Sequence, residues 1–120
     1  MGVQKPLSWL IAIVGAWELA APFVLGATAT TAFLADAIII GVALVVLGVW
    51  AALTDLRGTL RTLDWLNALV GVWLVAAPFV LGYTGVASAL WNDVLVGIAV
   101  AVLGGWAAVA LGQAQHPRTM

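Results

Sequence analysis

The sequence predicts an all-α membrane protein: four transmembrane helices, arranged as two tandem, parallel two-helix hairpin repeats. Three observations support this prediction: the apolar composition, four apolar stretches of spanning length, and a near-copy of the first half of the chain in the second. Of 120 residues, 65% are hydrophobic and 8% are charged, whereas soluble domains carry about 25% charged residues. So short a chain cannot bury this much apolar surface in a water-soluble core. We therefore expect membrane lipid to surround it.

The repeat becomes visible when the second half of the chain is aligned with the first. Segment 20–26, Ala-Ala-Pro-Phe-Val-Leu-Gly, matches segment 76–82 without a mismatch. Such agreement indicates a duplicated unit. The expected parts are a first two-helix repeat, a cytoplasmic linker, a second two-helix repeat and a cytoplasmic tail, at 1–55, 56–63, 64–111 and 112–120.

Each repeat holds two apolar stretches of about 20 residues, the length that crosses a bilayer as a helix. The expected spans are 8–26, 33–53, 64–82 and 90–111. They must be helices, because in lipid each backbone amide has to bond within its own segment. Ser8 and Asp64 stand at equivalent positions and are expected to be N-caps.

The basic residues predict the orientation. All of them fall on one side of the four spans: Lys5, Arg57, Arg61 and Arg118. The positive-inside rule then places both termini in the cytoplasm. Two spans per repeat make the repeats parallel, unlike the inverted repeats of many transporters. The net charge of −1 gives no footprint for nucleic acid.

The motif Trp-x5-Gly-x-Trp-x3-Ala-Pro-Phe-Val-Leu-Gly, present at 9–26 and again at 65–82, resembles the SPW repeat family of prokaryotic membrane proteins. The resemblance extends over about 7–109. The chain departs at the motif that names the family, since Ala-Pro-Phe stands at 21–23 and 77–79 in place of Ser-Pro-Trp. The resemblance implies a multi-pass protein of the prokaryotic cell membrane with no assigned reaction.

Glu18 is the acidic residue expected deepest in the membrane. It lies nine residues past Trp9, about 13 Å along the helix axis, where a charged side chain costs at least about 2.5–3.5 kcal/mol. It shares a helical face with Gly15 and Pro22, so we expect it at a protein interface and protonated at neutral pH. Three roles stay open: a structural hydrogen bond, a proton or ligand site, or pairing with a base of a partner subunit. Leu74 replaces it in the second repeat.

Two prolines and two tryptophans are also expected inside the spans. Pro22 and Pro78 each remove one helical amide, which predicts a kink; the alternative is that the freed carbonyl binds an ion. Trp17 and Trp73 are expected deeper in the membrane than the other tryptophans. Each is expected to pack between helices; the alternative is that it stacks on a ligand.

An outer rim is predicted from Asp36, Trp91 and Asp93. The two acids are expected in the first turns of their helices, where the helix dipole favours negative charge. The alternative is that Trp91, Asn92 and Asp93 form a contact surface at this rim. Small residues predict helix-packing seams, which close either within the chain or between chains. The glycines expected in these seams are Gly15, Gly41, Gly48, Gly71, Gly97 and Gly104.

The chain lacks the side chains of common catalytic and cofactor sites. It has no cysteine, its one histidine is His116 in the tail, and neither Ser8 nor Ser88 has a histidine beside it. We therefore expect no enzyme, no metal and no cofactor. The predicted role is structural or accessory, as a homo-oligomer or a subunit of a membrane complex, because no polar residues are expected to line the spans. The alternative is a small proton-coupled transporter or channel that uses Glu18, since one acid in the first of four helices resembles the small multidrug resistance transporters.

Overall fold

The structure is a computed structural model that describes residues 4–26 and 29–115. The described residues form helices and turns and no strand, and each helix is long and apolar enough to cross a membrane. The helices are α1 (Gln4–Val24), α2 (Thr31–Leu53), α3 (Arg57–Leu81) and α4 (Ala87–Gln115). The predicted all-α membrane class is confirmed.

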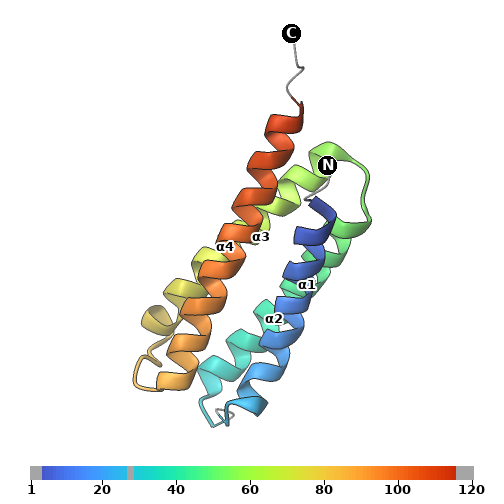
Figure 1. The fold of residues 1–120 in the computed structure, drawn as a ribbon. Coiled ribbons are helices and arrows are strands. Elements are labelled where there is room, and N and C mark those ends of the chain that lie inside the picture. Colours follow the sequence, from blue (N-terminus) through green and yellow to red (C-terminus); the bar gives the residue numbers. More distant parts are fainter. Residues whose placement is uncertain (1–3, 27–28, 116–120) are drawn as a thin grey trace.

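The helices pair as two antiparallel hairpins lying side by side (Figure 1). α1 packs mainly on α2 and α3 mainly on α4, while the hairpins meet along α2–α3 and α1–α4. We call the end where residues 25–30 and 82–86 connect each pair the hairpin end. The opposite end, where α1 and α3 begin, carries Lys5, Arg57 and Arg61 and is called the basic end.

The glycine seams close within each hairpin, which resolves the choice that the sequence left open. A Cβ atom on Gly48 of α2 would lie 2.6 Å from the Ala12 nitrogen of α1, and one on Gly104 of α4 would lie 2.7 Å from the Ala68 nitrogen of α3. Gly15 of α1 faces Gly41 of α2 in the same way, and Gly71 of α3 faces Gly97 of α4. These glycines let the paired helix backbones touch.

One buried residue from every helix forms an apolar layer at the centre of the bundle. Ile11, Leu44, Leu74 and Val100 have no exposed surface and pack together. The layer joins the two repeats across the middle of the bundle. Leu74, the counterpart of Glu18, belongs to this apolar layer, so the two positions have different surroundings.

The turn after the first helix of each repeat depends on glycine. Gly26 and Gly82 have φ values of 68° and 80°, in the left-handed region that side chains avoid. Pro22 and Pro78 are almost fully buried in the preceding turns, and both helices continue past them. A kink at either proline stays a prediction. The turn at Gly82 is followed at once by Tyr83, which is 3% exposed.

The helices of the basic end begin earlier than the sequence analysis expected. Ser8 and Asp64 are not N-caps, because α1 begins at Gln4 and α3 at Arg57. Most of the predicted linker is therefore helix, and the loop shrinks to residues 54–56. Leu60 and Leu63 explain the difference, since burying them against α2 and α4 stabilises the extra turns. The helix α4 continues into the predicted tail as far as Gln115, and Arg118 lies outside the described residues.

Candidate functional site

A buried polar cluster lies toward the hairpin end and joins the two repeats. We call it the carboxyl cluster: Glu18 of α1, Asp36 of α2, Asn92 and Asp93 of α4, and Tyr83 of the second turn. Glu18 and Asp93 have no exposed surface, and Asp36 is 7% exposed. The two donor hydrogens of the Asn92 amide are used: Nδ2 donates to Glu18 Oε1 at 2.7 Å and to Asp93 Oδ1 at 3.3 Å.

Tyr83 connects the two aspartates of the cluster. Its hydroxyl lies 3.3 Å from Asp36 Oδ2 and also forms a hydrogen bond with Asp93 Oδ2. Its ring packs against Phe33, with centroids 5.5 Å apart. Burial raises the pKa of the Tyr83 phenol, and the neighbouring carboxyl groups raise it further. The phenol therefore keeps its proton at any physiological pH.

Two tryptophans hold the cluster from opposite sides. Trp17 of the first repeat donates its Nε1–H to Asn92 Oδ1 at 2.8 Å, and Trp73 of the second repeat donates to Asp36 Oδ1 at 2.8 Å. Both bonds cross from one repeat to the other. The deep tryptophans therefore act as hydrogen-bond donors between the repeats, a role that the sequence analysis did not include.

Glu18 lies inside the bundle, on the helical face that the sequence indicated. Its Oε1 accepts the bond from Asn92, while Oε2 is buried with no hydrogen-bond partner among the described residues. The charges nearest to it are those of Asp93 and Asp36. Lys5 precedes it by thirteen residues on the same helix, about 20 Å along the axis. The cluster thus collects acids far from the bases of the basic end.

The predicted outer rim needs correction. Asp36 and Asp93 lie in the second turns of α2 and α4, not in the first, and both point into the bundle. The two carboxyl groups can be buried because indole, amide and phenol groups donate hydrogen bonds to them. These bonds, rather than the helix dipole, are the main stabilisation of the two acids. Of the three predicted rim residues only Trp91 is on the surface, with 59% of its area exposed. The spans are also more polar inside than expected.

Tyr83 is the cluster residue that the sequence analysis missed, and Asn92 was expected at the outer rim beside Trp91 and Asp93. A signal for Asn92 existed: it aligns with Asp36 when the two repeats are superimposed, so a polar residue recurs at the same repeat position. No comparable signal marks Tyr83, since its contacts depend on how the second turn folds over the bundle.

Two basic residues of the described chain, Lys5 and Arg57, donate to carbonyl oxygens near the C-termini of neighbouring helices. Lys5 Nζ donates to the Ala51 carbonyl oxygen at 3.2 Å and also to the Thr54 carbonyl oxygen, at the C-terminus of α2. Arg57 Nη2 donates to the Leu111 carbonyl oxygen of α4 at 3.4 Å. Cations at helix C-termini are favoured by the helix dipole. Each of these two bases therefore joins the two helices of its own hairpin: Lys5 joins α1 to α2, and Arg57 joins α3 to α4.

A second polar position lies nearer the basic end. Asp64 and Asn67 of α3 have no exposed surface, and none of their four side-chain polar atoms has a hydrogen-bond partner among the described residues. Ser8, the repeat counterpart of Asp64, is also fully buried. The Lys5 ammonium acts on Asp64 electrostatically. The apolar layer of Ile11 and Leu74 belongs to the middle of the bundle, apart from both polar positions.

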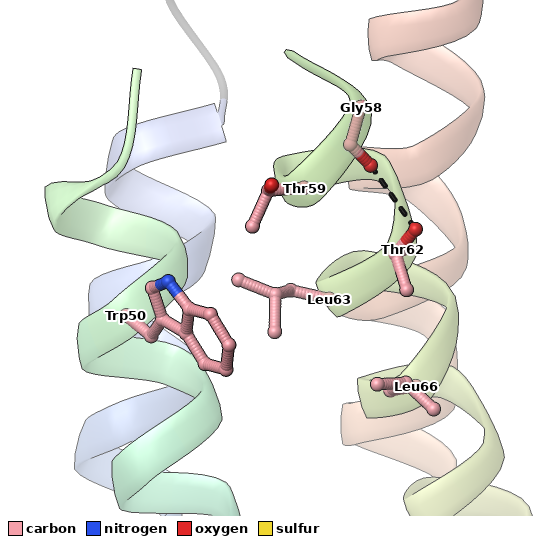
Figure 2. A pocket seen from close by; sticks show the side chains of 6 residues that line it. All are labelled: Trp50, Gly58, Thr59, Thr62, Leu63 and Leu66. Atoms are coloured by element: carbon pink, nitrogen blue, oxygen red, sulfur yellow. Dashed lines mark hydrogen bonds between the residues drawn. The ribbon is translucent and has the colours of Figure 1, made fainter. Parts of the chain in front are cut away.

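A surface hollow of about 330 Å³ at the basic end has little chemistry to offer (Figure 2). Trp50 of α2 and Leu63 of α3 point toward each other across it, with Thr59 beside them. Thr62 Oγ1 donates to the Gly58 carbonyl oxygen at 3.0 Å, within the same helix. Since none of the described residues that line the hollow is charged, the carboxyl cluster is the better candidate site.

In the described part of the chain, no group of three or more histidine, cysteine or acidic residues is arranged to hold a metal ion. Comparisons with curated proteins and with solved structures give no match. The SPW repeat domain matches residues 5–107, which include every residue of the cluster and reach from α1 into α4. The chain therefore belongs to the SPW repeat family of four-helix, membrane-type proteins.

Proposed function

We propose that this protein is a small proton-coupled transport protein and that the carboxyl cluster is its proton-binding site. One observation carries the proposal: three acids are buried together between the repeats, and no basic residue is among their hydrogen-bond partners in the described part of the chain. Three carboxylates ionised together inside the bundle would lose hydration and repel one another, with no basic hydrogen-bond partner among the described residues to offset the charge. Protons are the simplest means of removing that charge.

Hydrogen-bond counting supports a shared proton between Asp36 and Asp93. The Tyr83 hydroxyl has one hydrogen and two carboxyl neighbours, so it can donate to only one of them. The other contact is a hydrogen bond only if that aspartic acid is protonated and donates to the phenol oxygen. A proton can then move from Asp93 to Asp36: Asp93 gives its proton to the Tyr83 oxygen while the phenol proton passes to Asp36.

Glu18 supplies the third carboxyl and one unused oxygen. Asn92 holds Glu18 Oε1 and Asp93 Oδ1 at the same time, so a change of charge on one acid is felt by the other. The buried Oε2 has no partner among the described residues, which suits an atom that gains and loses a proton or faces a ligand.

The accessory role expected from the sequence has less support than proton binding. That expectation relied on spans without polar lining residues, whereas the carboxyl cluster is buried between them. Because Gly48 and Gly104 are covered by the partner helices of their own hairpins, their seams offer no free face to a second chain. The bonds of the cluster link the two repeats, but linking them does not need three buried acids without a basic partner among the described residues.

The proton site is tested by infrared spectroscopy of the protein in lipid bilayers. We expect a carboxylic-acid C=O band at neutral pH that disappears reversibly as the pH is raised. Glu18→Gln should remove part of the band, and Asp55→Asn, which changes an exposed loop acid, should leave it unchanged. Absence of the band at neutral pH, or a band that does not respond to pH, would overturn the proton site.

Transport is tested in liposomes with an imposed membrane potential and an internal pH dye. Wild-type protein should admit protons faster than empty liposomes do, and Glu18→Gln and Glu18→Leu should reduce the rate to that of empty liposomes. Because Glu18 lies in the polar cluster and Leu74 in the apolar layer, folding of Glu18→Leu is checked by circular dichroism. A folded Glu18→Leu variant that admits protons as fast as wild type would refute the role of Glu18, and wild-type protein no faster than empty liposomes would favour the accessory alternative.

A further inference from the structure

A groove between α2 and α3 leads from the membrane-facing surface to the carboxyl cluster. Its volume is about 340 Å³, and its wall is apolar except for Asp36 and the indole of Trp73. Ile39 at its edge is 66% exposed. The groove is large enough for a small organic molecule.

Comparison with a second groove shows that the first is distinguished by an acidic residue in its lining. It lies between α3 and α4, has a volume of about 410 Å³, and is lined by apolar side chains alone, including Ala76, Phe79 and Val102. A groove of that kind suits lipid chains. The α2–α3 groove differs from it by the carboxyl group of Asp36.

From these features we infer that the α2–α3 groove binds a monovalent, apolar-bodied organic cation, which enters from the membrane and places its charge beside Asp36. The inference rests on the proposed function, because it names the class of substrate that the cluster would exchange for protons.

Charge complementarity supports a cation. With one proton shared through Tyr83, as proposed above, Asp36 and Asp93 together keep one negative charge. Lys5, Arg57 and Arg61 lie at the basic end and do not compensate it. A monovalent cation in the groove would supply the missing positive charge.

The lining favours an organic cation over a metal ion. Both oxygens of Asp36 already accept hydrogen bonds, from Trp73 and Tyr83, and no other carboxyl group is among the described residues that line the groove. A metal ion such as Ca²⁺ needs about six to eight oxygen ligands. An alkylated pyridinium needs only a nearby negative charge, an apolar wall and an aromatic ring, and the ring of Trp73 can add a cation–π contact.

The repeat provides a variant that closes the groove. Ala35, which is exposed and lines the groove, is replaced in the second repeat by Trp91. Ala35→Trp would therefore fill the groove with the residue that α4 carries at the equivalent place. It leaves every member of the carboxyl cluster unchanged. Ala76→Trp is the matched control, because it puts the same side chain into the acid-free groove.

The experiment is equilibrium dialysis of radiolabelled N-hexylpyridinium against the purified full chain in detergent. We expect saturable binding that unlabelled cation displaces and that the neutral isostere hexylbenzene does not. Ala35→Trp and Asp36→Asn should weaken binding by about tenfold or more, and Ala76→Trp should not. Equal displacement by hexylbenzene, or wild-type binding by Ala35→Trp, would overturn the inference.

The liposome assay separates this inference from the proposed function. Loss of cation binding in Ala35→Trp together with normal proton entry would support both. Proton entry that depends on Glu18, in a wild-type protein that does not bind the cation, would overturn the inference and keep the proton site. Cation binding without any Glu18-dependent proton entry would keep the groove as a cation site and overturn proton coupling.

Discussion

Trp17 and Trp73 occupy the same position in the two repeats, and each donates its indole N–H to the other repeat over the same distance of 2.8 Å. Their acceptors, Asn92 and Asp36, also occupy equivalent positions of the two repeats. The repeats therefore hold each other by one reciprocal pair of bonds. Because the glycine seams serve the hairpins internally, these polar bonds are a specific link between the two halves.

The two indole bonds should differ in strength. Trp17→Phe and Trp73→Phe both keep an aromatic ring and lose the donor. We expect Trp17→Phe to lower the free energy of unfolding by about 1 kcal/mol, and Trp73→Phe by about 1.5–3 kcal/mol when its acceptor Asp36 is ionised. Unfolding by increasing SDS in mixed micelles measures both. Equal losses would indicate that Asp36 is neutral, and no loss in either variant would contradict the bonds.

Tyr83 gives a direct optical test of the cluster, because it is the single tyrosine of the chain. Burial raises its pKa, so tyrosinate absorbance should appear in the folded protein only well above pH 10, whereas an unfolded chain titrates at about pH 10. The phenol proton that the fold retains and the unfolded chain loses makes stability fall as the pH rises above about 10. The Tyr83→Phe variant is the control, because it has no tyrosine and should show no tyrosinate absorbance. A titration midpoint near pH 10 in the folded state would show that the phenol is exposed.

Substitution by alanine should have opposite effects on stability at the neighbouring residues Gly104 and Gly105. A Cβ on Gly104 would lie 2.7 Å from the Ala68 nitrogen, while one on Gly105 would meet nothing within 4 Å. Gly104→Ala should therefore force α3 and α4 apart and destabilise the protein. Gly105→Ala should be neutral or stabilise it by up to about 1 kcal/mol, since alanine favours the helix. Thermal unfolding in detergent compares the pair, and a Gly104→Ala protein as stable as wild type would contradict the close seam.

Lys5 should stabilise the first hairpin through the end of α2. Lys5→Met keeps an apolar side chain of similar length and removes the bonds to the carbonyls of Ala51 and Thr54. We expect a loss of about 1 kcal/mol. Arg61→Met, at an exposed site of the same end, should cost less. Hydrogen exchange of the last turn of α2 reports the effect locally, and unchanged exchange in Lys5→Met would argue against the cap.

The class of fold and its repeat were predictable because both depend on local patterns: span length, apolar composition and the recurrence of segment 20–26 at 76–82. The helical face that carries Glu18 followed from helix periodicity, whereas its depth in a membrane stays a prediction. Helix starts were predicted less well, since Ser8 and Asp64 look like caps, and the burial of Leu60 and Leu63 that extends α3 depends on tertiary contacts.

The carboxyl cluster was predicted only in part for the same reason. Asp36 and Asp93 near the start of a helix are typical of dipole stabilisation, and nothing in their local sequence indicates that they face Tyr83. Their contacts require the second hairpin to be placed against the first. The available clue was that Asp36 is equivalent to Asn92, and Trp17 to Trp73, in the two repeats. When a polar residue and a hydrogen-bond donor each recur at the same repeat position, the donor of one repeat can meet the polar residue of the other.

The reciprocity of the tryptophan bonds also bears on how such a chain can arise. Two copies of a one-hairpin protein, related by a twofold axis, could make both bonds at once with a single gene. Any residue of that ancestor would appear twice, so an acid at the position of Glu18 would recur at the position of Leu74. Fusion into one chain removes that constraint and permits Glu18 in one half and Leu74 in the other. An acid that serves the carboxyl cluster and a leucine that serves the apolar layer, at the same repeat position, form an asymmetry that gene duplication makes available and that a symmetric dimer cannot build.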